Sequence, residues 1–153
     1  MRPGAHLISG IIMGGAVFAA TERIDAAMLC SIANVVSDTD HLIEYGVYCL
    51  KYTIKPNFQE FMSGSYFSAK GTLGIVFHGY EYLLGLALIC ILLWRQGDLN
   101  ALNSFAFTIG YGMHLLMDLL GNDCGFKGYS LIYRLLVGFD EKKICGKQQG
   151  ENE

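Results

Sequence analysis

Residues 72–94 read TLGIVFHGYEYLLGLALICILLW, and residues 101–120 read ALNSFAFTIGYGMHLLMDLL. A helix needs roughly 20 predominantly apolar residues to cross a bilayer, and both runs reach that length. Only the short polar stretch RQGDLN at residues 95–100 separates them. The pattern therefore predicts two antiparallel membrane-spanning helices joined by a tight turn.

The N-terminal third contains two shorter apolar runs, LISGIIMGGAVFAA at residues 7–20 and IDAAMLCSIANVV at residues 24–36. Runs of this length form buried helices, re-entrant segments or signal-peptide cores. Gly10 and Gly14 form a GxxxG pattern, which lets helix backbones approach closely in lipid. We predict a second helical hairpin that turns at residues 21–25 and either spans or re-enters the bilayer.

The remaining segments are predicted to lie outside the bundle. A helix is expected to end before Pro56, because proline disfavours a helical residue in front of it. Residues 57–71 are predicted to form a loop, and residues 129–139 a short interfacial helix. The sequence thus predicts an all-α integral membrane bundle of about four helices over residues 1–139, followed by a polar tail at 140–153.

Composition agrees with a membrane location. The chain has 153 residues, enough for one domain, and 52% of them are hydrophobic while 16% are charged. Soluble domains are about one-quarter charged, so this chain has little polar surface. The net charge of −3 excludes a basic surface for nucleic acid. Five widely spaced cysteines without a CxxC pattern predict free thiols.

Ionisable residues interrupt the apolar runs in a repeated spacing. His114 precedes Asp118 by four positions, and His78 precedes Glu81 by three. A histidine and a carboxylate one helical turn apart share a helix face and offer two metal ligands. The motif SDTDH at residues 37–41 repeats the three-residue spacing.

These residues are also matched in depth. Glu81 and His114 lie equally far from the turn at residues 95–100, and His6 and Asp40 lie equally far from the turn at residues 21–25. All four histidines are therefore predicted at one end of the bundle, each near a carboxylate. Hydrogen bonds between helices explain a single such pair, but burying several carboxylates without a cation is costly.

The order of the motifs resembles a known family. AHL with His6, SDTDH at 37–41, HGY at 78–80 and GYGMHLLMDLL at 110–120 are similar to the motifs of the membrane-bound metal-dependent hydrolases. The chain also distantly resembles the zinc-dependent phospholipase C and nuclease group. Two residues depart from the motifs of the membrane-bound metal-dependent hydrolases. Ser37 stands where those motifs have proline, and Glu81 appears in a segment where they have a second histidine.

The resemblance, with the spacing, implies a zinc hydrolase with one or two zinc ions, or another divalent transition metal. The expected ligands are His6, Asp38, His41, His78, Glu81, His114 and Asp118. Asp40 is expected either to support a ligand or to act as the general base. Zinc lowers the pKa of bound water toward about 7. A site near the membrane interface suggests a lipid phosphoester, or another amphiphilic ester, as substrate.

Two other functions remain open. A metal or proton transporter needs polar groups along the whole span, whereas LLGLALICILLW at residues 83–94 has none. A membrane protein with a structural metal would keep a closed coordination shell.

Lysine and arginine favour the cytoplasmic side, and only Arg23 and Arg95 lie at the turns. The metal-site end carries Arg2, Lys51, Lys55, Lys70, Lys127, Arg134, Lys142, Lys143 and Lys147. That end of an inner-membrane protein is therefore predicted to face the cytoplasm.

Overall fold

The computed structural model describes residues 3–146 and is all-helical, as the sequence predicts; this part of the chain contains no β-strand. In chain order the helices are α1 (Pro3–Thr21), α2 (Ile24–Val36), α3 (Thr39–Tyr52), α4 (Phe58–Ser63), α5 (Ser65–Lys70), α6 (Tyr80–Arg95), α7 (Ala101–Gly121), the 3-10 helix η1 (Phe126–Tyr129), α8 (Leu131–Leu136) and α9 (Glu141–Cys145). Arg2 and Lys147, two charges of the topology prediction, lie outside the described residues.

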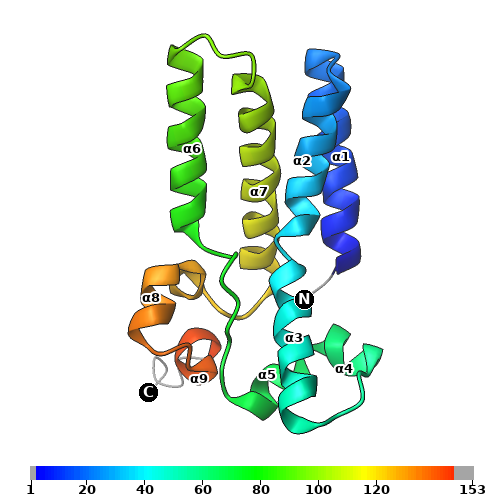
Figure 1. Cartoon of the computed structure of the whole chain (residues 1–153), viewed down its shortest axis with the longest axis vertical. Helices are drawn as coiled ribbons and strands as arrows, with labels where there is room; N and C mark the ends of the chain where they lie inside the picture. The colour runs from blue at the N-terminus through cyan, green and yellow to red at the C-terminus, as the bar shows by residue number, and fades with distance from the viewer. Residues whose placement is uncertain (1–2, 147–153) are drawn as a thin grey trace, which may run out of the picture.

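Four helices form the upper half of the molecule, and the smaller ones gather below them with α3 (Figure 1). The pairs α1–α2 and α6–α7 are the two predicted hairpins, and their turns lie where the sequence places them. Gly97 adopts a φ of +67° in the second turn, a conformation that glycine adopts without strain. Both hairpin predictions are therefore confirmed as arrangements of helices.

Small residues bring α1, α2 and α7 into close contact. A Cβ on Gly14 would lie 2.8 Å from the carbonyl oxygen of Ala27, so the predicted GxxxG face does pack against α2. A Cβ on Gly110 would lie 2.1 Å from the carbonyl oxygen of Cys30. Only glycine permits this approach of α7 to α2. These contacts fix the helices that carry His6 and His114.

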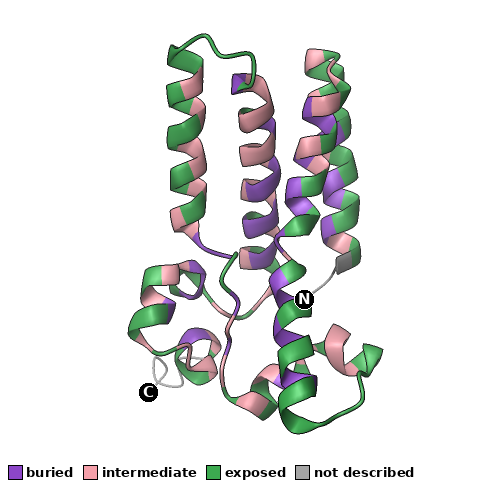
Figure 2. Cartoon of the chain, viewed as in Figure 1, coloured by how far each residue is buried: buried purple, intermediate pink, exposed green. Residues whose placement is uncertain are grey.

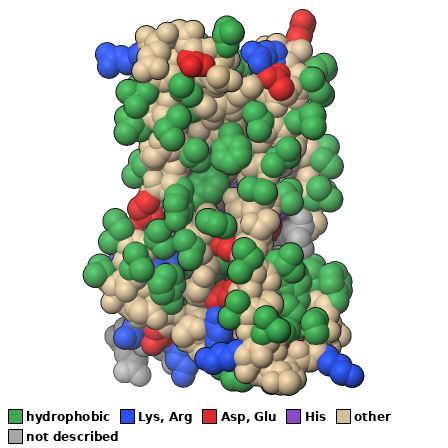
Figure 3. Space-filling view, in the orientation of Figure 1, with side chains coloured by type: hydrophobic (Ala, Val, Ile, Leu, Met, Phe, Trp, Pro, Cys, Tyr) green, Lys and Arg blue, Asp and Glu red, His purple; other side chains and the backbone are tan. Residues whose placement is uncertain are grey.

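The outer faces of the helices are apolar and exposed. Every residue of α6 is at least partly exposed, with Leu84 71% and Trp94 76% accessible. Figure 2 shows exposed residues along the outer faces of the upper helices. Figure 3 shows apolar side chains, in green, spread over the upper half of the visible face, with charged side chains at its top edge and in its lower half. Within residues 3–146, one helix, over Gly4–Thr21, is long and apolar enough to cross a membrane by length and composition. The predicted bundle of membrane-spanning helices is therefore confirmed as a helical bundle but not as a multi-span membrane domain.

The prediction of a continuous helix over residues 72–94 is wrong for its first third. Helix α6 begins only at Tyr80, and residues 72–79 run below the bundle as irregular chain. The Tyr111 hydroxyl donates toward the carbonyl oxygens of Phe77 (2.7 Å) and Gly79 (2.9 Å), and Arg134 Nη1 donates to that of Ile75 (2.6 Å). These side chains satisfy backbone groups that a helix would otherwise pair internally.

Two predicted irregular segments are also partly helical. Residues 57–71 were predicted as a loop but contain α4 and α5; the Asn57 side chain caps α4 by accepting from the amides of Gln59 and Glu60. The tail predicted from residue 140 instead begins with α9, which Asp140 caps through the amide of Lys143. Residues 147–153 of that tail lie outside the described residues.

The prediction of five free cysteines is wrong for two of them. Cys124 and Cys145 form a disulfide that ties α9 to the segment after α7. Cys30, Cys49 and Cys90 are free thiols. The pairing brings together residues separated by 21 positions, and no spacing motif in the sequence indicates it.

Candidate metal centre

The four histidines of the chain meet at the lower end of α1 and α7. Their rings form a continuous row: the centroids of His6 and His114 are 4.3 Å apart, those of His114 and His78 are 4.8 Å apart, and those of His78 and His41 are 5.0 Å apart. All four are buried, and His78 and His114 are completely so. The prediction that the histidines share one end of the bundle is confirmed.

His78 and His114 face each other through their Nε2 atoms, which are 2.9 Å apart. The Nδ1 atom of His114 lies 2.7 Å from the carbonyl oxygen of Asn34, and that of His78 lies 3.3 Å from Asp40 Oδ2. A carbonyl and a carboxylate only accept hydrogen bonds, so both Nδ1 atoms carry protons. If both rings are neutral, two Nε2 lone pairs converge, and either a proton on one ring or a metal ion between the rings removes their repulsion.

Two carboxylates complete this pair of donors. Asp38 Oδ1 lies 3.4 Å from His78 Nε2 and 3.8 Å from His114 Nε2. Asp118 Oδ2 lies 3.3 Å and 3.6 Å from the same two atoms. Ligands at about 2.0–2.1 Å around a tetrahedral ion are separated by about 3.4 Å. The distances from the two Nε2 atoms to each carboxylate are close to this value, whereas the two Nε2 atoms lie closer together than two ligands of one ion. His78 and His114 with one carboxylate therefore form a candidate set of three donors once the two rings separate slightly.

His6 and His41 extend the cluster on opposite sides. His6 Nε2 lies 3.1 Å from the second oxygen of Asp118, and His41 Nε2 lies 3.8 Å from Asp38 Oδ1. The carboxylate of Asp118 therefore contacts His6 with one oxygen and the central histidines with the other. This arrangement supplies more donors than one tetrahedral ion uses.

Unpaired polar atoms concentrate in the same place. Asp38 Oδ1, Asp40 Oδ1, His6 Nδ1 and His41 Nδ1 are buried without a hydrogen-bond partner in the described part of the chain. An unpaired buried acceptor costs about 1–3 kcal/mol, and more when it is charged. A cation beside Asp38 Oδ1 removes the largest of these costs. Three overlapping groups of these side chains can hold a metal ion: His6, His114 and Asp118; Asp38, His78 and His114; and Asp40, His41 and His78.

His78 and His41, which lie below the bundle, have pKa values shifted in opposite directions by their surroundings. Although burial opposes protonation, the carboxylates of Asp38 and Asp40 raise the pKa of His78 to about 9. Burial, with the nearby charge of His78, lowers the pKa of His41 to about 4. At neutral pH a metal ion therefore competes with a proton at His78 but not at His41.

Glu81, a predicted ligand, lies outside the cluster. Its carboxylate accepts from the Ser130 hydroxyl (2.7 Å) and from the amides of Leu131 (2.9 Å) and Ile132 (3.1 Å), and so caps α8. The spacing argument assumed a helix through His78 and Glu81. Because α6 begins between them, at Tyr80, the two side chains do not share a helix face.

Asp40 lies behind His78, the position that its predicted role of supporting a ligand requires. Its Oδ2 accepts from the Phe77 amide at 2.7 Å and faces His78 Nδ1. A carboxylate behind a ligating histidine fixes the ring and makes it a stronger ligand. Asp40 belongs with His41 and His78 rather than pointing away from them, as a helical arrangement of SDTDH would predict.

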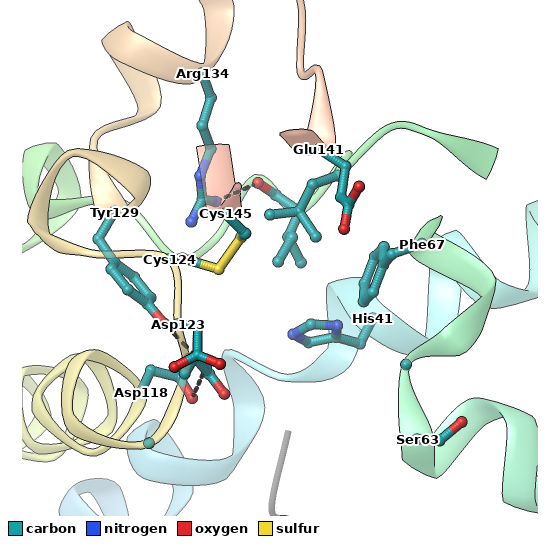
Figure 4. A pocket seen from close by; sticks show the side chains of 15 residues that line it. His41, Ser63, Phe67, Asp118, Asp123, Cys124, Tyr129, Arg134, Glu141 and Cys145 are labelled. Atoms are coloured by element: carbon teal, nitrogen blue, oxygen red, sulfur yellow. Dashed lines mark hydrogen bonds between the residues drawn. A yellow bond between two sulfur atoms is a disulfide. The ribbon is translucent and has the colours of Figure 1, made fainter. Parts of the chain in front are cut away.

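Two cavities lead to the cluster. One, of about 260 Å³, lies between the bundle and the C-terminal helices and is bordered by His41, Asp118, Tyr129 and Arg134 (Figure 4). The other, of about 270 Å³, is bordered by His6 and Asp118.

Arg134 and Asn34 were not predicted as site residues. Arg134 interrupts an apolar run, and this interruption was a signal that the sequence offered. Asn34 takes part through its backbone carbonyl, which no pattern of side chains indicates.

Comparison with known proteins adds no assignment. The chain matches no protein-family model, no curated protein and no solved structure. The function must therefore be argued from the geometry of the cluster and its cavities.

Proposed function

We propose that this protein is a membrane-embedded zinc hydrolase that cleaves a lipid phosphoester, or another amphiphilic ester, near the membrane interface. The observation that carries the proposal is the convergence of His78 Nε2 and His114 Nε2 with two carboxylates, Asp38 on one side and Asp118, which also lines a cavity, on the other. Catalytic zinc sites combine three protein ligands with a position open to water or substrate.

The donor chemistry favours zinc. Imidazole nitrogens and carboxylate oxygens in a tetrahedral set suit Zn²⁺, whereas Mg²⁺ and Ca²⁺ prefer six or more oxygen ligands. Asp118 contacts His6 as well as the central pair, which provides ligands for a second ion. Zinc supplies Lewis acidity and lowers the pKa of water near to neutrality.

The protein's own groups prepare these ligands. Asn34 O and Asp40 Oδ2 hold the Nδ1 protons of His114 and His78, so the Nε2 lone pairs point into the cluster. Because Asp40 Oδ2 already accepts from Phe77 and His78, we assign Asp40 to orienting His78 rather than to accepting a proton from water.

Exposed apolar surface supports the membrane location. The four long helices present leucine, isoleucine and phenylalanine side chains outward, more than a water-exposed surface normally carries. An apolar groove of about 470 Å³ runs beside α6 and is bordered by Ser37 and Phe77, the chain neighbours of Asp38 and His78. An amphiphile can place its chain there while its polar group reaches the level of the histidines.

A combined measurement tests this function. Full-length protein purified in detergent without chelator is analysed for transition metals, then loaded with zinc and assayed on short-chain phospholipids. Asp118→Asn is compared with Asp98→Asn, which changes an aspartate in the opposite turn. Zinc binding with hydrolysis that only Asp118→Asn abolishes supports the proposal. Zinc binding without hydrolysis of any ester points to a structural metal, and zinc flux into liposomes points to a transporter.

A further inference from the structure

Arg134 is a buried cation without an acidic partner. Its side chain is 1% exposed, its Nε donates to the Gly128 carbonyl at 2.5 Å, and its Nη1 donates to the Ile75 carbonyl at 2.6 Å. Among residues 3–146, neither an Asp nor a Glu carboxylate lies within 4.0 Å of it. Arginine stays charged in proteins, and an unpaired buried charge is strongly unfavourable.

The guanidinium borders a cavity that two of the candidate metal ligands also line. His41, Asp118 and Arg134 all line this space of about 260 Å³. Figure 4 shows Arg134 entering from one side, and Asp118 and His41 lying across the cavity from it. Since one water occupies about 30 Å³ of liquid, the volume holds a phosphate-sized group with several waters.

The other charges of the cavity do not neutralise Arg134. Asp118 is engaged with His6 and His78, and Glu141 accepts from the Ser68 hydroxyl. Asp123 also lines the space without forming an ion pair to Arg134. These acids weaken the binding of an anion beside Arg134, and cations bound at the cluster would offset their charge. An anion between Arg134 and a loaded cluster would face positive charge on both sides.

We propose that Arg134 binds the anionic oxygens of a phosphate group, which it holds opposite the metal ligands. This inference rests on the proposed function and names the chemical class that the cavity accepts. Nε and one hydrogen of Nη1 are bonded to carbonyls, so the end of the guanidinium can still offer one hydrogen from Nη1 and one from Nη2. Two parallel hydrogen bonds from this planar end match two phosphate oxygens, a geometry that lysine cannot reproduce. Arg134 thereby determines specificity for phosphoesters over neutral esters.

Phosphate titration of the full-length protein tests the proposal. The thermal unfolding midpoint is measured against inorganic phosphate at constant ionic strength, with chloride as the reference anion. We expect phosphate to raise the midpoint of the wild-type protein, with at least a tenfold weaker apparent affinity in Arg134→Gln and an intermediate affinity in Arg134→Lys. The matched control is Arg95→Gln, at the opposite end of the molecule, and it should bind phosphate like the wild type.

Further readouts separate this proposal from the function on which it rests. Zinc content is measured in each variant, because Arg134 also holds Ile75 in place. Equal phosphate affinity in the wild type and in Arg134→Gln of unchanged zinc content would overturn the proposal. If the variants do not fold, the Nε–H resonance of Arg134 in the wild type must shift on phosphate addition, and its failure to move would equally refute the assignment.

The titration is performed with and without zinc. An absence of zinc binding therefore counts against the hydrolase, while an Arg134-dependent phosphate effect still supports the anion site. A second titration uses a short-chain phosphatidic acid. Tighter binding than inorganic phosphate identifies a lipid headgroup as the source, and equal binding identifies a soluble phosphate.

Discussion

The Nε2 atoms of His78 and His114 lie 2.9 Å apart in the buried centre of the protein, although the residues are 36 positions apart in the chain. His114 comes from the middle of a helix, whereas His78 comes from irregular chain just before another helix. Each ring is oriented by an acceptor at Nδ1. Substitution of one histidine of this pair is therefore the most direct test of the candidate metal site.

Replacing His114 by Ala should abolish stoichiometric zinc binding. The substitution removes one of two converging nitrogens and leaves Asp38 and Asp118 without their shared cation. We expect at least a tenfold loss of zinc affinity, measured by competition with a chromogenic chelator. Asp98→Asn is the control. Unchanged zinc content in His114→Ala would exclude the central pair as the binding site.

Replacing Glu81 by Gln should leave zinc content unchanged and lower stability. Its carboxylate caps α8 and does not reach the cluster. Loss of a capping carboxylate costs about 1 kcal/mol. Metal analysis together with denaturant unfolding measures both effects. Zinc loss at retained stability would restore Glu81 to the ligand set.

Zinc affinity should keep rising from pH 7 to pH 9. The pKa of His78 is raised to about 9 by Asp38 and Asp40, so protons compete with metal throughout this range and the affinity increases as they leave. The expected gain approaches tenfold per pH unit for one displaced proton. Asp40→Asn removes one of the carboxylates that raise this pKa, so its affinity curve should flatten above pH 7. Identical curves for both proteins would contradict this assignment.

Replacing Tyr111 by Phe should weaken the metal site without touching a ligand. The Tyr111 hydroxyl binds the carbonyl oxygens of Phe77 and Gly79, on either side of His78. Its loss leaves buried carbonyls unpaired, at a cost of about 1–3 kcal/mol. We expect a lower unfolding free energy and weaker zinc binding. Tyr52→Phe, in the exposed end of α3, is the control.

The orientation in the membrane can be tested by thiol labelling. The proposed cytoplasmic location of the metal site rests on its lysines, whereas the Cys124–Cys145 disulfide is typical of oxidising compartments. We expect the lysines to determine orientation, because positively charged loops stay on the cytoplasmic side when the helices insert. An impermeant reagent should then label Gln96→Cys in intact cells. Unlabelled Gln96→Cys that becomes labelled only after the membrane is permeabilised would place the metal-site end outside.

The sequence predicted the parts of the fold that depend on local pattern. Apolar runs located both hairpins, and counting residues from their turns placed His6 and His114 at one level. The family resemblance and the enzymatic function are tested by neither the fold nor the comparisons, and they stay predictions. The proposed multi-helix membrane bundle likewise extends beyond the one helix that qualifies as a span.

The failures share a physical cause. Apolar residues 72–79 look like the start of a spanning helix, but Tyr111 and Arg134, which are distant in the chain, satisfy their carbonyl groups instead. The misplaced helix start then misassigned Glu81 as a ligand. The Cys124–Cys145 pair depends on the docking of α9, which spacing alone does not reveal.

The support of residues 72–79 by the C-terminal segment also sets an order of events during synthesis. The Leu73 amide donates to the Phe139 carbonyl, and Arg134 holds Ile75, so the support of residues 72–79 is complete only after the chain has been made beyond residue 139. A growing chain that ends before α8 therefore holds all four histidines without the last contacts that support the segment of His78. Completion of the candidate metal site would thus be a late event in synthesis, and a chain truncated before α8 would present these histidines in a less constrained arrangement.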